Sequence, residues 1–429
     1  MRNSSRRFFS SVTGTTLGAT VPVVAFLVTQ AVLAACFAIL TARFMGPVDR
    51  GVIVLTTTSA SILMLVGSVG AATGGRMLLS RNDARYSLSR HKRFTLLLCS
   101  VHLATMALLG WPLLLLASAW RGWVVAAAFL AYGVATLGVY MLREALHGVG
   151  KHVLATSGDV VLNIALVLGV TLLHSRNYVR VPSVTWLLAL AALIELLFLA
   201  ISLTVVKQVP GQVVPIPFRA FLRLSAPALA GALAQAFTIR GDRILLGALD
   251  GPRSVGIYGT AATFTEALWI IPLGVGQILF RLSGQGDLPR VRQLRRIALV
   301  SVLLLAVCGA GTAKPAVRIL LGTEYAASVP LIWVLLFASI PMSLYLLQAQ
   351  ILNGSGDLRG TAIAGVTSAV VLLVGCVSFI PLWGAVGAAC ASILAYSSMA
   401  AIASLRVRRI TLSESTVLNG PNSGGPSDV

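Results

Sequence analysis

The stretch Gly46-Pro47-Val48-Asp49-Arg50-Gly51 returns 205 residues later as Gly251-Pro252-Arg253-Ser254-Val255-Gly256. The Gly-Pro pair and the second glycine keep their spacing in both copies. The same shift, or one that is longer by a single residue, pairs further polar, glycine and proline residues: Pro22 with Pro227, Gln30 with Gln235, Arg76 with Arg281, Gly148 with Gly354 and Gly150 with Gly356. An apolar composition does not easily produce such matches, so we infer that the chain contains two copies of one unit.

The composition around these repeats is typical of a membrane protein. Of the 429 residues, 57% are hydrophobic and 11% are charged, whereas a soluble globular chain has roughly 25% charged residues. This excludes a water-soluble enzyme. Because each crossing of a bilayer takes about 20 apolar residues, the sequence predicts an all-α integral membrane protein with about twelve transmembrane helices, six in each copy of the repeat.

An even number of crossings gives both copies the same orientation in the membrane, related by an axis along the membrane normal. The repeat therefore predicts two parallel six-helix bundles that face each other across a cavity. A cavity that opens alternately to the two sides is the usual basis of a secondary transporter. The predicted divisions are a first bundle over residues 1–206, a cytoplasmic interfacial linker over 207–223, a second bundle over 224–409 and a disordered cytoplasmic tail over 410–429.

The net charge of +20 comes mainly from Lys and Arg in alternate short loops between the apolar runs. This is the positive-inside pattern of a membrane protein, and it differs from the basic face of a nucleic-acid-binding protein. It predicts that both termini are cytoplasmic and that nucleic acid is not a partner. The five cysteines lie in apolar runs, and neither they nor the histidines have metal-ligand spacing, so no metal, disulfide or cofactor is predicted.

Four segments carry a resemblance to a known family: 43–51, 242–258, 353–357 and 384–389. With these segments the chain resembles the polysaccharide biosynthesis branch, the Wzx-type oligosaccharide-lipid flippases, of the multidrug/oligosaccharidyl-lipid/polysaccharide (MOP) exporter superfamily. The resemblance implies a MATE-like fold of twelve helices in two lobes. It also implies that the protein moves a polyprenyl-diphosphate-linked oligosaccharide from the inner to the outer leaflet by alternating access.

The same resemblance implies a location and partners. The location is the bacterial inner membrane, and the substrate is a lipid-linked oligosaccharide among membrane lipids. Polysaccharide polymerase or glycosyltransferases of the same pathway are further expected partners. No hydrolysis site is expected, so the protein is predicted not to be an enzyme.

The predicted seventh span contains the candidate substrate-binding residues Arg240, Asp242 and Arg243. Ionisable residues inside a membrane are costly and usually face a partner or a water-filled cavity. Arg provides planar, bidentate donors for a diphosphate. The alternative is an ion pair of these arginines with Asp242 or Glu266 inside the bundle. Helical spacing places Gln235, Thr238 and Asp242 on one face and the two arginines on another.

Gln30 and Gln235 occupy matching positions in the two repeats. Across a central cavity, their amides would offer hydrogen bonds to sugar hydroxyls. An equal alternative is that they hold neighbouring helices together.

Arg76 and Arg281 end the second helix of each repeat and are candidates for a gate or a substrate entrance. The alternative for both is positive-inside anchoring. Glu195 and Glu266 are candidates for binding a coupling proton, because a carboxyl group in surroundings of low dielectric constant can exchange a proton near neutral pH. The alternative is a buried acid that is hydrogen-bonded or paired.

Two other functions compete with the flippase. The first is a cation-coupled multidrug or small-molecule exporter on the same fold, but the first span, from Val21 to Leu40, has no acidic residue on which such coupling could depend. The second is a membrane-bound enzyme of the same pathway. The short outer loops, which leave no room for a catalytic domain, disfavour it.

Overall fold

The computed structural model describes residues 2–80, 83, 85–116, 119, 121–206, 216–285 and 287–418. Within these residues the protein is all-α, as the sequence predicts. The helices, including a π-helix (η1) and two 3₁₀ turns (η2 and η3), are α1 (Arg2–Ser68), α2 (Ala71–Ser80), α3 (Leu88–Thr105), η1 (Met106–Gly110), α4 (Trp111–Leu116), α5 (Trp123–Gly148), α6 (His152–Ser175), α7 (Val181–Ser202), α8 (Phe218–Asp250), α9 (Pro252–Glu266), η2 (Ala267–Trp269), α10 (Ile270–Gly284), α11 (Leu288–Leu320), η3 (Thr323–Tyr325), α12 (Ser328–Ser355) and α13 (Leu358–Leu418).

Nine helical stretches in the described residues are long and apolar enough to cross a membrane. Two of them, Ala25–Ser68 and Arg359–Arg409, have 44 and 51 residues. An α-helix of 44 residues is about 66 Å long, roughly twice the hydrocarbon thickness. Each contains a break with non-helical dihedral angles, at Gly46 and at Gly384, so each provides two crossings.

One more crossing comes from α8. Its parts Phe218–Ala226 and Leu229–Asp250 form a pair bent by 51° that is also apolar enough to span. Together with the two double helices, this pair brings the described part of the chain to the twelve crossings that the sequence predicts.

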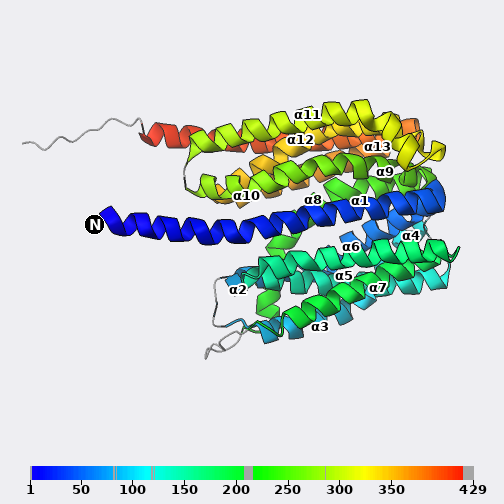
Figure 1. The fold of residues 1–429 in the computed structure, drawn as a ribbon, viewed down its shortest axis with the longest axis horizontal. Helices are drawn as coiled ribbons and strands as arrows, with labels where there is room; N and C mark the ends of the chain where they lie inside the picture. The colour runs from blue at the N-terminus through cyan, green and yellow to red at the C-terminus, as the bar shows by residue number, and fades with distance from the viewer. Residues whose placement is uncertain are drawn as a thin grey trace, which may run out of the picture.

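Figure 1 shows the helices in two groups, with α2 to α7 on one side and α9 to α13 on the other. The helices α1 and α8 run between the groups. We call the first group the N-terminal bundle and the second the C-terminal bundle. The close packing of α8 on α13 assigns α8 to the C-terminal bundle, while α8 also contacts α1 and α2 of the other half.

Two predicted segments are more helical than expected. The predicted linker lies outside the described residues over 207–215, but α8 already begins at Phe218. The helix α13 continues to Leu418 and so includes the first part of the tail that is expected to be disordered. Residues 410–418 contain neither Gly nor Pro, so nothing in their sequence ends the helix. Residues 419–429 lie outside the described part.

The sequence repeat produces a repeated turn in the backbone. Gly46 has φ 72° and ψ 172°, and its counterpart Gly251 has φ 86° and ψ 175°. A positive φ is easily adopted only by glycine, and the proline that follows each one suits the first position of the next helix. Gly150 and Gly356 are a second such pair, with φ of 76° and 90°. The duplication is therefore visible in the conformation as well as in the sequence.

The two repeats contact each other through a pair of glycines in a reciprocal way. A Cβ atom on Gly51 would lie 1.7 Å from the carbonyl oxygen of Pro252, and one on Gly256 would lie 1.9 Å from that of Pro47. Only glycine fits at either position, because the backbones of α1 and α9 touch there. We call this contact, between 46–51 and 251–256, the glycine junction.

Tyr325 adds a polar contact near the glycine junction. Its hydroxyl donates a hydrogen bond of 3.1 Å to the carbonyl oxygen of Ala42. Burial raises the pKa of this hydroxyl, so it stays protonated as a donor. The contact joins η3 in the C-terminal half to α1 in the N-terminal half.

Candidate functional site

Arg240 forms a polar contact between the two halves of the protein. It lies on α8, and its Nη1 atom donates a hydrogen bond of 3.2 Å to the hydroxyl of Ser61, on the second half of α1. The Arg240 side chain is partly buried. Among the described residues no carboxylate forms an ion pair with it. Arg240 therefore presents a cation, held by a neutral partner, where the halves meet.

Arg243, by contrast, has its partners inside the C-terminal bundle. Its Nη2 atom donates to Glu266 of α9 in a close ion pair. Its backbone N–H donates to the Asp242 carboxylate at 2.8 Å. The structure thus has the intra-bundle ion pair that the sequence left open as an alternative for Arg243, and Arg240 and Arg243 have separate partners.

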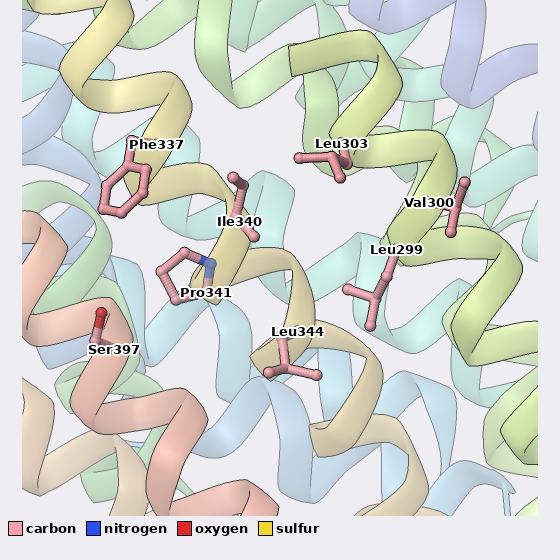
Figure 2. Close-up of a pocket in the computed structure, with 8 residues that line it drawn as sticks. All are labelled: Leu299, Val300, Leu303, Phe337, Ile340, Pro341, Leu344 and Ser397. Carbon is pink, nitrogen blue, oxygen red and sulfur yellow. The ribbon is translucent and has the colours of Figure 1, made fainter. Parts of the chain in front are cut away.

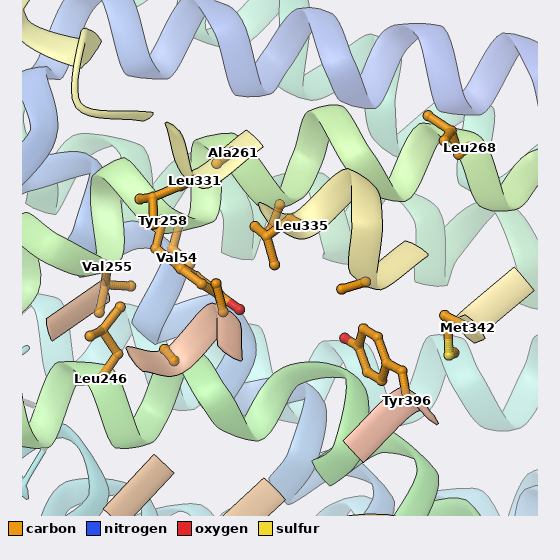
Figure 3. Close-up of a cluster of buried hydrophobic side chains, with 14 of the residues drawn as sticks. Val54, Leu246, Val255, Tyr258, Ala261, Leu268, Leu331, Leu335, Met342 and Tyr396 are labelled. Atoms are coloured by element: carbon orange, nitrogen blue, oxygen red, sulfur yellow. The ribbon is translucent and has the colours of Figure 1, made fainter. Parts of the chain in front are cut away.

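Asp242 is completely surrounded by protein. It accepts hydrogen bonds from the hydroxyl of Tyr258 and from that of Ser392, the latter at 3.1 Å. Figure 3 shows Tyr258 among the packed apolar side chains of Leu246 and Val255. The arrangement gives a buried carboxylate its required partners and makes Asp242 part of the bundle's internal structure.

The face of α8 that is predicted to carry Gln235, Thr238 and Asp242 packs against α13. Thr238 forms a hydrogen bond of 2.8 Å with Ser368, and Asp242 bonds Ser392, both on α13. The predicted common face of Thr238 and Asp242 is therefore confirmed, but it packs on a neighbouring helix of the same bundle.

A small cavity adjoins this charged group. It is lined by Asp242, Arg243, Glu266 and Trp269, among others. It has room for about one water molecule. An oligosaccharide or a diphosphate does not fit in it, so this cavity is no substrate site in this conformation.

The N-terminal bundle has its own charged group. Arg143 of α5 forms an ion pair with Asp159 of α6. Glu195 of α7 is 2% exposed, and its Oε1 atom has no hydrogen-bond partner among the described residues. A Cβ on Gly158 would lie 3.3 Å from that oxygen, which places Glu195 against α6. Glu195 is thus a buried carboxylate with spare acceptor capacity.

The repeat-paired residues differ in their surroundings. Arg76 pairs with Glu144 at 3.2 Å, whereas Arg281 is exposed and forms no ion pair with any described residue. Gln30 is partly buried with an unpartnered, buried Oε1 atom. Gln235 is partly buried too. Among the described residues, no hydrogen bond joins Gln30 to Gln235, and Arg76 and Arg281 have different surroundings.

Sequence reasoning missed Arg50, which lies beside the glycine junction. Its side chain is 7% exposed, and its Nε atom is buried without a hydrogen-bond partner among the described residues. It lies within the repeated segment 46–51 but is not among the candidate site residues that the sequence predicts. Its position inside the repeated Gly-Pro segment was the available signal, since that segment forms the contact between the halves.

These features define a class: a multi-pass membrane transporter built from two repeated helical bundles. The structure is similar to an inward-facing multidrug resistance MATE family transporter of the MOP superfamily, with a TM-score of 0.72 and 15% identity over 90% of this chain and 96% of that one. It is equally similar to the lipid II flippase MurJ in an inward closed conformation, with a TM-score of 0.72 and 12% identity over 93% and 94%. An outward-facing MATE transporter matches with a TM-score of 0.64 and 17% identity over 92% and 95%.

Sequence comparison then identifies the family. The model of the polysaccharide biosynthesis protein family matches residues 19–280, which is more than half of the chain. The chain belongs to this family, as its resemblance predicts. None of the curated proteins matches it.

Proposed function

We propose that this transporter is a flippase for polyprenyl-diphosphate-linked oligosaccharides. The observation that carries the proposal is Arg240, a partly buried cation between the halves whose hydrogen-bond partner is the neutral hydroxyl of Ser61. A cation inside a membrane protein usually serves a partner or a pathway. Family membership and the likeness to a lipid II flippase support the same conclusion.

The chemistry of Arg240 suits a diphosphate. A charge-assisted hydrogen bond to a phosphate oxygen is about twice as strong as a bond to a neutral acceptor. A substrate headgroup would therefore replace Ser61 as the partner of Arg240. A cationic drug would be repelled at the same place, which favours an anionic substrate.

The glycine junction supports alternating access. It closes the contact between the bundles at one end, while the repeat symmetry allows the bundles to move against each other as two bodies. The greater similarity to the inward-facing MATE transporter than to the outward-facing one is consistent with a closed outer side. We infer that the junction separates when the substrate is released outside.

The remaining candidates have supporting roles in this proposal. Gln30 and Gln235 would bind sugar hydroxyls, and Asp242 would position α8. Glu195 is the stronger coupling candidate, because its carboxylate has a free acceptor atom while Glu266 is paired with Arg243.

At the membrane surface, Arg76 and Arg281 would meet phosphate groups at the inner leaflet. We place the protein in the bacterial inner membrane with both termini cytoplasmic. Its partners would be polymerase or glycosyltransferases of the same pathway, and it would have no enzymatic activity of its own.

The test is a flipping assay with the purified full chain in liposomes. A polyprenyl-diphosphate oligosaccharide with a fluorescent sugar becomes inaccessible to a membrane-impermeant quencher when it is flipped. We expect Arg240→Gln to slow flipping about tenfold or more, since a hydrogen bond to a charged group contributes about 1.5–3 kcal/mol. Arg176→Gln, at an exposed position between α6 and α7, is the control and should keep the wild-type rate. Equal rates in the two variants would refute the role of Arg240.

A second candidate function has one observation in its favour. The free carboxylate atom of Glu195 in the N-terminal bundle, on a MATE-like fold, also suits a cation-coupled exporter. Uptake of a cationic dye into the same liposomes under a proton or sodium gradient would favour the exporter. Accumulation of a lipid-linked oligosaccharide in a strain depleted of the protein, measured by mass spectrometry of lipid extracts, would favour the flippase.

A further inference from the structure

A group of arginines on the C-terminal bundle lies away from the interface between the halves. Arg292 and Arg295 of α11 and Arg408 of α13 line one pocket of about 380 Å³. Arg292, Arg296 and Arg408 lie close enough to Arg295 for their charges to act on it. No described carboxylate forms an ion pair with Arg292, Arg295 or Arg296. We call this the arginine pocket. Arg292 and Arg295 give it positive charge that no described carboxylate pairs with, which favours an anionic ligand.

A second polar group in the pocket also has unused capacity. Gln348 of α12 is 3% exposed, and its amide nitrogen donates to Ser404 of α13 at 2.7 Å. Its Oε1 atom is buried and has no hydrogen-bond partner among the described residues. Because Gln348 and Ser404 both line the arginine pocket, a ligand with a hydroxyl donor beside its negative charge would satisfy the pocket.

An apolar groove lies beside the arginine pocket. Leu299 and Leu344 line both, so the two spaces are neighbours. The groove has a volume of about 430 Å³. Figure 2 shows Leu299 and Leu303 of α11 on one side and Phe337 and Pro341 of α12 on the other.

The groove opens to the surroundings of the protein. Leu303 is 49% and Phe337 62% exposed, so in a membrane they face lipid chains. Figure 1 shows α11 on the side of the C-terminal bundle that is remote from the N-terminal bundle. The start of α11 and the end of α13 lie at the end of the molecule that carries the N-terminus, which the charge pattern predicts to be cytoplasmic.

We propose that this composite site binds an anionic glycerophospholipid of the cytoplasmic leaflet. The phosphate lies among Arg292, Arg295 and Arg408, a headgroup hydroxyl donates to Gln348, and one acyl chain occupies the groove. Basic pockets between transmembrane helices on the cytoplasmic side recognise lipid headgroups in this way. The lipid fills the space between α11 and α13 and holds these helices together. The proposal goes beyond the flippase function and does not depend on it, because the site faces away from Arg240.

The experiment measures lipid binding to the purified full chain in detergent. Phosphatidylglycerol and phosphatidylcholine with identical acyl chains are added separately, and bound lipid is counted by native mass spectrometry while thermal stability is followed in parallel. We expect phosphatidylglycerol to remain bound and to raise Tm, since a ligand that binds only the folded state stabilises it. Phosphatidylcholine should do neither. Equal binding of the two lipids would overturn the proposal.

Two variants locate the headgroup. Arg292→Gln combined with Arg295→Gln should weaken phosphatidylglycerol binding about thirtyfold, from about 1 kcal/mol per arginine. Without lipid this variant should be at least as stable as wild type, because like charges are removed. Arg290→Gln, whose arginine pairs with the neighbouring Asp287, is the control and should bind like wild type. Unchanged binding in the double variant would refute the headgroup site.

Two further variants test the groove. Leu303→Trp fills it and should displace the lipid, while Leu305→Trp, at an exposed position of α11 outside the groove, should not. Inorganic phosphate should fail to compete at millimolar concentration. If phosphate competes and Leu303→Trp has no effect, the pocket binds a free anion instead. If polyprenyl phosphate binds more tightly than phosphatidylglycerol, the site belongs to the substrate carrier, which would also overturn the proposal.

Discussion

The two bundles share one repeated unit, and they are alike in their backbone but unlike in their charges. Both have a Gly-Pro turn with a positive φ, and each supplies one glycine and one carbonyl oxygen to the glycine junction. Their partly buried ion pairs, however, differ: Arg143 with Asp159 joins α5 to α6 in the N-terminal bundle, and Arg243 with Glu266 joins α8 to α9 in the C-terminal bundle. The comparison indicates that the two copies have remained alike at the glycine junction, where the halves touch, and have diverged in the positions of their ion pairs.

The largest expected effect comes from breaking the charge network of the C-terminal bundle. Arg243→Met leaves Glu266 unpaired, while the backbone N–H of residue 243 still donates to Asp242. Breaking a buried pair by removing one partner costs about 3–5 kcal/mol, and because the Glu266 side chain is 29% exposed, we expect a loss at the lower end of this range. Thermal and chemical denaturation of the purified protein in detergent measure the change. Arg243→Met combined with Glu266→Leu should recover most of the loss, and a double variant as unstable as the single one would contradict this account.

The next prediction tests the feature that the two bundles share, the glycine junction. Gly51→Ala and Gly256→Ala each insert a Cβ into a backbone carbonyl, and overpacking of this kind costs about 1–3 kcal/mol. Because the contact is reciprocal, the two variants should lose similar stability in the same denaturation assay. Gly311→Ala, on α11 with nothing within 4 Å of the added atom, is the control and should be neutral or slightly stabilising. A clear difference between the two junction variants would mean that the halves do not share the contact equally.

Glu195 tests whether the N-terminal bundle contributes the coupling group. Glu195→Gln replaces a buried carboxyl group that is not fully hydrogen-bonded by an amide of the same shape, so stability should change by about 1 kcal/mol or less. Flipping in liposomes should lose its dependence on an imposed pH gradient. The matched variant Glu266→Gln should lose stability, because Arg243 is left unpaired, but keep the gradient dependence. A gradient dependence that survives in Glu195→Gln would remove Glu195 from the coupling mechanism.

The smallest effect concerns the repeat-paired arginines. The side chain of Arg76 is 48% exposed in its pair with Glu144, and such surface pairs contribute about 0–1 kcal/mol. Arg76→Ala should therefore lower stability by less than about 1 kcal/mol, and Arg281→Ala should leave it unchanged. Denaturation at low and high salt checks both, since salt screens the pair. Equal salt-dependent losses would show that the two positions are still equivalent.

The fold was accessible from the sequence because its determinants are local. The Gly-Pro turns are set by a glycine that can adopt a positive φ and by the proline after it, and both are visible as a repeat. The apolar runs between charged loops predicted the crossings because the length and hydrophobicity of a membrane span are also local properties of the sequence. The helix α13, however, continues past Arg409. Residues 410–418 are mostly polar, which favours disorder, but they contain no Gly or Pro that would end a helix.

The site was less accessible, because the partner of a charged residue depends on the rotation of its helix. Arg240 and Arg243 are three residues apart, yet one donates to α1 of the N-terminal half and the other pairs within the C-terminal bundle. Helix rotation is set by packing against neighbours, which the sequence of one helix does not contain. Arg50 was missed for the same reason, since only the contact between α1 and its neighbours buries it.

The glycine junction also bears on how such a chain could arise. Each half supplies both a glycine and the carbonyl that lies against the other half's glycine, so the surface is self-complementary, as in a two-fold symmetric dimer. Two copies of a half-length ancestor could therefore have formed the contact before their genes were fused. After fusion, the two copies could diverge in their side chains. The two glycines could not change, because any side chain there would clash with the backbone of the other copy.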